Sequence, residues 1–363
     1  MKFSIKADKF KEMVSRSIKG ASCNKLIPLT GLMAVELKKK TLTLITTDST
    51  NYLYIRENKV DEEDFYVTVP VETFSKLIAR MTCETITLEV KNDSLEVSGN
   101  GKYLIELPQD ENGQMIKFPD PLSKIKASPL GEVKSSTISS ILTTAKPALA
   151  TTLEVPCYTG YYVGEQVIAT DTYKICGINE RLLNNDCLIS PDMMNLLAVM
   201  TTEKISVDSK DDILIFSSPD CVVYGPIMDG IEDYQIDAIT GLLESRFPST
   251  CKIPKAALLQ VLDRLALFVT TNDKDGIFLT FTKDGLIIRS KASSGEELIP
   301  YHESKNFKEF VCCINIGYLQ SLVKSQVTDM IEIHYGEDNA IKMVDGNVTL
   351  IIALLDEEAE EEE

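Results

Sequence analysis

The residues that most often catalyse reactions or bind metals are scarce in this chain, and their spacing favours neither role. The two histidines, His302 and His334, are not in a metal-ligand spacing, and a lone histidine is usually an ordinary surface or strand residue. The nine cysteines are an odd number, scattered and without a C-x-x-C pair. This usage indicates reduced, mostly buried thiols. We therefore expect no metal site, no disulfide framework and no cofactor.

Four consecutive acidic residues, Asp61 to Asp64, form the one cluster that suggests a cation site. Consecutive residues of a strand alternate between its faces, and the cluster lacks the turn glycine of a calcium loop, so we predict a solvated loop. The sequence also contains no phosphate-binding glycine loop, H-E-x-x-H or nucleophile-elbow pattern. We predict that the chain is not an enzyme.

A polar stretch interrupts an otherwise strand-like segment, VIATDTYKICGI at 167–178. Its five central residues, Thr170 to Lys174, are polar, and unpaired polar groups are costly to bury. They must therefore have partners or lie at a surface. Asp171 follows Asp48 of TLTLITTDSTNYLYIR by 123 residues, so the interruption occupies a position in a repeat.

Three segments of the chain share one pattern. Each gives a short apolar strand, a Pro or Asn, a helix of about three turns and three alternating strands separated by polar turns. The segments start at Phe65, Asp186 and Phe310, which are 121 and 124 residues apart. A period of about 120 residues is too long for a solenoid repeat. It fits three copies of one α+β domain, each with two helices and roughly eight strands.

Composition suggests where these domains end. A chain of 363 residues is long enough for two or three domains that each have a core. The stretches DPLSKIKASPLGE and SRFPSTCK are rich in Pro, Ser or charge, as linkers are. We predict domains at 1–125, 126–248 and 249–363, with a disordered acidic tail at 356–363. With 44% hydrophobic residues and no long apolar run or signal peptide, the protein is expected to be soluble and cytoplasmic.

The charge of the chain is unevenly distributed. The net charge is −18, which alone argues against nucleic acid binding. The six predicted helices nevertheless carry +6 together, which leaves −24 for the rest; they are 7–20, 71–81, 133–149, 190–200, 255–269 and 315–327. Two explanations of the positive helices remain open. Their lysines could simply solvate amphipathic helices, or the helices could form one basic surface that faces a polyanion. Scattered Lys and Arg without an aromatic platform suit the backbone of duplex DNA better than a single strand.

In several motifs the sequence resembles the bacterial DNA polymerase III beta subunit, the sliding clamp. These motifs are MKFSIKADKF, KLIPLTGLMAVEL, VTVPVETFSKLI, ATDTYK and RFPS, and the resemblance extends over essentially the whole chain. It implies three clamp domains per chain and two chains closing head-to-tail into a ring, domain 1 of one against domain 3 of the other. It also implies a processivity factor that encircles double-stranded DNA without sequence preference. Its partners would be the replicative polymerase, the clamp loader and a second copy of itself.

The resemblance implies two sites. Duplex contact is expected from basic residues on or beside the helices: Arg16, Lys19, Lys25, Lys76, Arg80, Lys134, Lys146, Lys255, Arg264 and Lys324. A pocket for a short hydrophobic partner peptide is expected between domains 2 and 3, with Tyr173 and Lys174 orienting the peptide and Lys174 meeting an acidic residue of it. The pocket residues are Thr170, Tyr173, Lys174, Ile175, Pro248, Ile253, Ile351, Ala353 and Leu354.

The sequence departs from the family in three places. Thr172 and Tyr173 stand where the family usually has Gly and His, ALL replaces its Met-Pro-Met-Arg-Leu-like ending, and the acidic tail is additional. A virus-encoded or otherwise divergent clamp would explain these differences. Two other functions remain open, namely a DNA-processing or carboxylate-metal enzyme on a repeated α+β frame and an acidic DNA mimic. For Thr170 to Lys174, a plain surface turn supported by Asp171 is the alternative to a binding site.

Overall fold

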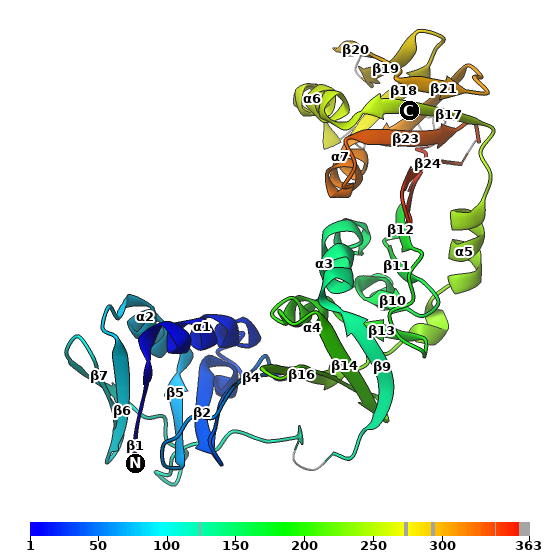
Figure 1. Ribbon diagram of the computed structural model, residues 1–363. Helices are drawn as coiled ribbons and strands as arrows, with labels where there is room; N and C mark the ends of the chain where they lie inside the picture. Colours follow the sequence, from blue (N-terminus) through cyan, green and yellow to red (C-terminus); the bar gives the residue numbers. More distant parts are fainter. Residues whose placement is uncertain (123–124, 272–274, 292–294, 338, 356–363) are drawn as a thin grey trace. The chain divides into compact units, whose positions relative to one another are not determined.

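The computed structural model describes residues 1–122, 125–271, 275–291, 295–337 and 339–355, which form two compact units (Figure 1). Unit 1 contains 1–138 and 192–227, and unit 2 contains 139–191 and the described residues from 228 onward. The acidic tail predicted at 356–363 lies outside the described residues. The domain boundaries at 125 and 248 remain predictions.

Unit 1 is built from two antiparallel sheets and the helices that cover them. Its strands are β1 (Lys2–Lys6), β2 (Leu32–Lys38), β3 (Thr41–Thr47), β4 (Tyr52–Asn58), β5 (Phe65–Pro70), β6 (Thr85–Lys91), β7 (Ser94–Ser98), β8 (Lys102–Glu106), β9 (Ser128–Lys134), β14 (Lys204–Lys210), β15 (Ile213–Ser217) and β16 (Cys221–Pro226). Among the described residues, the strand orders are β1-β6-β7-β8 and β5-β2-β3-β4-β16-β15-β14-β9.

Two helices of unit 1, α1 (Ala7–Ser17) and α2 (Val71–Arg80), pack side by side. In α1 the buried Phe10, Met13 and Val14 recur at helical spacing, which turns one apolar face toward the sheets. The ring of Phe10 lies 6.0 Å from that of Phe74 in α2, at nearly a right angle. Burial of each such ring contributes roughly 1.5–3 kcal/mol. The short 3₁₀ turns η1 (Ile18–Gly20) and η2 (Pro28–Gly31) follow α1.

The chain crosses between the units three times, within α3 (Ser135–Thr144), at the start of α4 (Pro191–Leu197) and between residues 227 and 228. Unit 2 also has two antiparallel sheets. Its strands are β10 (Tyr161–Val163), β11 (Val167–Thr170), β12 (Lys174–Ile178), β13 (Cys187–Ile189), β17 (Ser249–Pro254), β18 (Gly276–Phe281), β19 (Gly285–Ser290), β20 (Glu296–Pro300), β21 (Glu303–Lys305), β22 (Phe310–Asn315), β23 (Met330–Tyr335), β24 (Ala340–Asp345) and β25 (Val348–Ala353). In the described part of unit 2, the strand orders are β13-β10-β11-β12-β25-β24-β23-β17-β21 and β20-β19-β18-β22.

The helices of unit 2 lie on both sides of its larger sheet. They are α5 (Ile236–Glu244), α6 (Lys255–Leu265) and α7 (Ile316–Ser325), with the 3₁₀ turns η4 (Lys146–Ala148), η5 (Pro156–Thr159), η6 (Ile231–Asp233) and η7 (Ala266–Phe268). In Figure 1, α5 lies on the opposite side of this sheet from α7. None of the helices in the described residues is long and apolar enough to cross a membrane.

Each large sheet joins strands from two of the three sequence repeats. In unit 1, β4 pairs with β16, and Tyr54 lies opposite Val222. In unit 2, β12 pairs with β25, and Ile175 lies opposite Ile351. The predicted α+β fold is confirmed, and the six predicted helices correspond to α1, α2, α3, α4, α6 and α7. Helix α5 was not predicted.

Candidate functional site

Residues 170–174 form the turn that joins β11 to β12. The hydroxyl of Thr170 donates to the carbonyl of Lys174 at 2.8 Å. Oδ1 of Asp171 accepts the backbone N–H groups of Tyr173 at 3.0 Å and Lys174 at 2.7 Å, while Thr172 adopts a left-handed φ of 78°. Short polar side chains stabilise turns by such local bonds. The polar groups of this strand-like stretch therefore find partners within the turn.

The side chain of Lys174 is buried, whereas that of Tyr173 is exposed. Nζ of Lys174 lies 3.1 Å from Oδ2 of Asp171, donates to the carbonyl of Pro147 at 2.7 Å and sits 4.8 Å from the ring centre of Tyr318. Its side chain is only 10% exposed. Tyr173 is 56% exposed and stacks on Tyr318 at 6.1 Å. The charge of Lys174 is thus balanced inside unit 2, whereas Tyr173 faces solvent.

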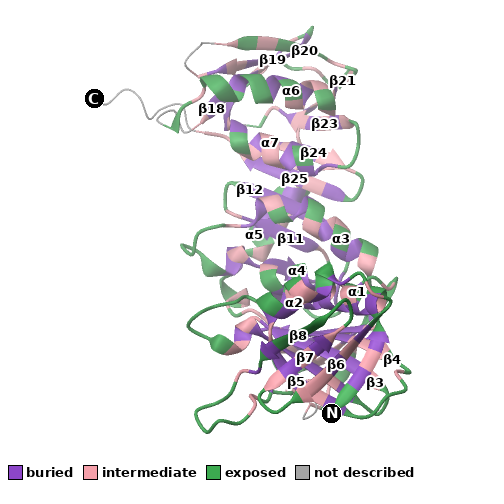
Figure 2. Cartoon of the chain, turned by 90° about the vertical axis from the view of Figure 1, so that its left-hand side faces the viewer, coloured by how far each residue is buried: buried purple, intermediate pink, exposed green. Residues whose placement is uncertain are grey.

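Ile175 and Ile351 form the apolar floor beside this turn. They lie opposite each other on β12 and β25, two largely buried strands (Figure 2). Both belong to one buried cluster that also contains Tyr234, Ile239 and Leu243. The last two come from α5, so this unpredicted helix supplies part of the apolar surface at the candidate site.

The remaining residues of the expected pocket differ in their surroundings, and not all of them contact this floor. The backbone N–H of Ala353 donates to the carbonyl of Tyr173 at 2.9 Å, and that of Leu354 to the carbonyl of Asn339 at 3.0 Å. Pro248 is exposed and its ring lies beside Gly336. Ile253 is fully buried on β17, opposite Ile331, and is not in the cluster of Ile175 and Ile351.

A cavity of about 160 Å³ opens over Ile351. The end of α5 and the segment after it supply Leu242, Ser245, Arg246 and Phe247, and the start of β24 and the turn before it supply Glu337, Asn339 and Ala340. Helix α5 and Tyr318 also belong to this site, and the sequence analysis predicts neither. Ile236, Ile239 and Leu243 recur at helical spacing, and this pattern could have predicted α5 from the sequence.

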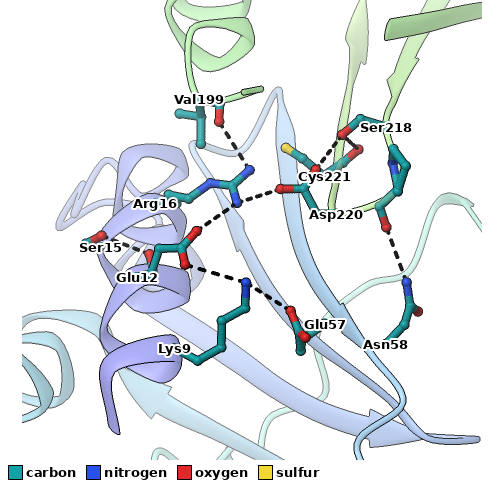
Figure 3. Close-up of polar contacts among 11 residues, drawn as sticks. Lys9, Glu12, Ser15, Arg16, Glu57, Asn58, Val199, Ser218, Asp220 and Cys221 are labelled. Atoms are coloured by element: carbon teal, nitrogen blue, oxygen red, sulfur yellow. Dashed lines mark hydrogen bonds and ion pairs between the residues drawn. The ribbon is translucent and has the colours of Figure 1, made fainter. Parts of the chain in front are cut away.

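Arg16, an expected DNA contact, binds other residues of unit 1 (Figure 3). Its guanidinium donates to Asp220 at 2.7 Å and to the carbonyl of Val199 at 3.2 Å, and it lies 3.7 Å from Glu12. Burial alone would raise the pKa of Asp220, but hydrogen bonds from Arg16 and Ser218 hold that pKa below its usual value. With its side chain only 13% exposed, Arg16 has little free charge for a ligand.

The other expected DNA contacts fall into two groups. Four have internal partners: Lys76 with Glu72, Lys255 with the carbonyls of Lys324 and Gln326, Arg264 with Glu297, and Lys324 with Asp263. Lys146 opens η4 and also makes an internal contact. The second group is exposed and makes no ion pair with any described residue; it contains Lys19, Lys25, Arg80 and Lys134.

The acidic cluster at Asp61 to Asp64 lies in the exposed loop between β4 and β5. Asp61 pairs with Lys40 at 2.6 Å, which lowers the pKa of its carboxyl group. Within the described ranges, no group of three or more His, Cys, Asp or Glu side chains is placed to hold a metal ion.

Comparison with known proteins places this geometry in context. Residues 1–114 match the family model described as DNA polymerase III beta subunit, N-terminal domain. No curated protein sequence matches the chain.

Solved structures match almost the whole chain. The beta subunit of DNA polymerase from Streptococcus pyogenes is 14% identical, covers 98% of this chain and 100% of its own, and has a TM-score of 0.86. The DNA polymerase III beta chain from Streptococcus pneumoniae TIGR4 is 15% identical, with 98% and 99% coverage and a TM-score of 0.84. The DNA polymerase sliding clamp from Bacillus subtilis is 16% identical, with 98% and 99% coverage and a TM-score of 0.82. The resemblance seen in the sequence is therefore confirmed: residues 1–114 match the N-terminal domain family of the DNA polymerase III beta subunit, and the chain has the fold of the bacterial sliding clamps.

Proposed function

We propose that this chain is a DNA polymerase processivity factor, a ring-shaped clamp that encircles duplex DNA in the cytoplasm and tethers the replicative polymerase and clamp loader. The observation that carries the proposal is the match to bacterial beta subunits and sliding clamps over 98% of the chain. These proteins lend no support to a metal-dependent DNA-processing enzyme or an acidic DNA mimic. A clamp acts by encircling DNA and needs no chemical step of its own, so we infer that the chain is not catalytic.

Two exposed sheet edges support a head-to-tail dimer. In unit 1 the edge strand β8 exposes Tyr103 (42%) and Leu104 (68%), and in unit 2 the edge strand β20 exposes Leu298 (51%). Exposed edges with apolar side chains readily pair with another chain. Because the two edges differ, their pairing is heterologous, and such contacts give a closed ring or an open filament. We infer the closed ring of two chains.

The unpaired cations Lys19, Lys25, Arg80 and Lys134 are the strongest candidates for duplex contact. Each contact is expected to be weak and independent of sequence, because a clamp that gripped phosphates tightly would not slide. Cations already paired with carboxylates would contribute less, since a phosphate would have to displace their partners.

Retention on circular DNA tests the ring. We expect light scattering to give the mass of a dimer, and loaded protein to stay on nicked circular DNA and leave it after linearisation. Reversing Lys19, Lys25, Arg80 and Lys134 to Glu should reduce loading. Reversing four exposed lysines at strand ends and turns, Lys39, Lys59, Lys210 and Lys283, changes the net charge equally and is the control. A monomer that does not assemble on DNA would overturn the ring. Duplex cleavage with magnesium or manganese would favour the enzyme instead.

We also propose that the turn at 170–174, the floor of Ile175 and Ile351 and the adjoining cavity receive a short hydrophobic segment of the polymerase. A few aliphatic side chains, each worth roughly 1.5–3 kcal/mol when buried, leave affinity on the order of micromolar after the costs of association.

Titration of the cognate polymerase's clamp-binding peptide tests this pocket. Ile175→Asp should reduce affinity at least tenfold because a carboxylate replaces apolar floor, while Tyr52→Asp, at the corresponding position of unit 1, should not. Equal affinity for wild type and Ile175→Asp would leave the turn as a plain surface turn.

A further inference from the structure

A second cavity, of about 570 Å³, lies in unit 1 where β2 ends and β5 begins. This volume falls within the roughly 300–1,000 Å³ of sites that bind whole small molecules. Leu37 and Phe65, which lie opposite each other on the two strands, supply apolar surface. Met1, Met115 and Phe118 supply the rest, and methionine side chains adapt to the shape of a ligand. The cavity therefore suits a compact ligand with an apolar body.

The wall that contains Met115 and Phe118 is fixed to the sheet. The hydroxyl of Thr68 donates to the carbonyl of Ile116 at 2.7 Å, and the backbone N–H of Phe118 donates to the hydroxyl oxygen of Tyr66 at 2.8 Å. These bonds hold the segment after β8 against β5, so the cavity is formed before a ligand enters. Because little of the chain must become ordered on binding, a small ligand can bind with useful affinity.

Glu36 is the half-buried charged residue of the cavity. Its carboxylate makes neither an ion pair nor a hydrogen bond with any described residue. Lys38, Asp64 and Lys117 also line the cavity but are exposed. Neither lysine side chain pairs with a described residue, whereas Asp64 accepts the backbone N–H of Lys39 at 3.2 Å. An ammonium group would supply the partner that Glu36 lacks, since a carboxylate withdrawn from water is costly without a cation.

The charges at this cavity disfavour a ligand of one sign. A ligand with only a positive charge would be repelled by Lys38 and Lys117. A ligand with only a negative charge would meet Glu36 and a chain of net charge −18. A ligand that carries both charges can pair with the acid and with the lysines.

We propose that this cavity binds a small zwitterion with an apolar body, of which a dipeptide with two apolar side chains is the simplest example. Its ammonium group pairs with Glu36, and its carboxylate pairs with Lys38 and Lys117 at the rim. Its apolar side chains pack against Leu37 and Phe65. None of the lining residues belongs to the expected duplex contacts or to the partner pocket, so this site goes beyond the proposed function and does not depend on it.

Isothermal titration calorimetry of the full chain with four probes tests this inference. The probes are the dipeptide Leu-Phe, its N-acetyl form, its C-terminal amide and the dipeptide Ser-Gly. Leu-Phe should bind with a Kd on the order of 100 μM. Loss of the ammonium group or of the carboxylate should weaken binding about fivefold at low salt. Ser-Gly has both charges but no apolar side chain, and it should not bind measurably.

Variants that neutralise the charges separate the two pairings. Glu36→Gln should bind Leu-Phe about fivefold more weakly and lose the preference over the N-acetyl form. The double variant of Lys38→Gln and Lys117→Gln should lose the preference over the amide but keep the preference for the ammonium group. Glu84→Gln and Lys210→Gln change exposed residues of the same unit outside the cavity. These matched controls should keep both preferences.

Three results would overturn the inference. The first is the absence of saturable Leu-Phe binding at millimolar concentration. The second is binding of Leu-Phe by the wild type that is no tighter than binding of one of the other three probes. The third is a charge preference that survives in the variant designed to remove it, either Glu36→Gln for the ammonium group or the double lysine variant for the carboxylate.

Discussion

The turn at 47–51 in unit 1 and the turn at 170–174 in unit 2 have nearly the same backbone hydrogen bonds. Oδ1 of Asp48 accepts the N–H groups of Thr50 at 2.8 Å and Asn51 at 2.7 Å, just as Asp171 does for the corresponding residues. Ser49 has a left-handed φ of 90°, where Thr172 has 78°. The Thr-Asp pair thus builds the turn in both repeats, and its presence alone does not mark a binding site.

The two turns differ at the fifth position and in what surrounds it. In unit 1, the side-chain amide of Asn51 bonds Oδ2 of Asp48 at 2.8 Å. In unit 2 an ammonium group takes this place, since Lys174 pairs with Oδ2 of Asp171 and also reaches Pro147 and Tyr318. A local bond from a neutral amide donor has become a contact between opposite charges that links three segments of unit 2.

The surfaces beside the turns differ as well. Tyr52 follows the first turn, and its ring lies 5.8 Å from that of Tyr224, in an area where the segment after β8 contributes Ile116 and Phe118. Ile175 follows the second turn, and α5 contributes Ile239 and Leu243. In both units the segment that follows a repeat covers the sheet beside the turn. Differences in binding should therefore come from these covering segments, α5 above all.

Lys174→Met is expected to have the largest effect on stability. It leaves the carboxylate of Asp171, 15% exposed, without its cation, and such a loss costs roughly 2–4 kcal/mol. Asn51→Ala at the corresponding position removes one hydrogen bond from a neutral amide to a carboxylate and should cost about 1.5 kcal/mol. Hydrogen exchange of the β12 and β4 amides gives both local opening free energies. Equal losses would show that the charge adds nothing to the second turn.

Local sequence patterns predict most of the fold of this molecule. The repeated strand–helix–strand pattern predicted the fold and six helices correctly, because apolar periodicity records which face of each element is buried. Helix α5 is absent from the prediction because residues 236–244 lie between the repeated strand–helix–strand pattern and the linker SRFPSTCK, outside both, although Ile239 and Leu243 are buried.

Site residues were harder to predict, since their environment depends on distant parts of the chain. Arg16 was counted as a free cation, yet its partner Asp220 is 204 residues away. Tyr318 was overlooked because nothing near it in sequence indicates that it will contact Tyr173 and Lys174. Local patterns specify the turn at 170–174 but not its neighbours.

Tyr173→Ala should separate a binding role from a structural one. The ring is 56% exposed, so its loss should change stability by less than about 1 kcal/mol. Affinity for the cognate polymerase peptide should fall severalfold, because the stacked pair with Tyr318 borders the floor. Thr50→Ala, at the corresponding position of unit 1, is the control and should change neither quantity. Unchanged affinity in Tyr173→Ala would remove this ring from the site.

The smallest expected effect is a difference in acid sensitivity between the units. Both histidines of the chain lie in unit 2. Burial lowers the pKa of His334, although the Glu332 carboxylate at 3.0 Å opposes this shift, and the cations Lys252 and Lys342 add to it.

Because folding favours neutral His334, its contribution to stability is complete above the unfolded pKa of about 6.5. That contribution is lost as pH falls from this value toward the lower folded pKa, since the unfolded chain then binds the proton first. The β23 amides should lose less than about 1 kcal/mol of protection between pH 7.5 and 5.5, and His334→Gln should reduce this loss. The β4 amides of unit 1, which contains no histidine, serve as the internal reference. If the β23 amides of His334→Gln lose as much protection as those of the wild type, the acid sensitivity belongs to carboxylates. The two units would then differ in their turns and covering segments but not in a histidine titration.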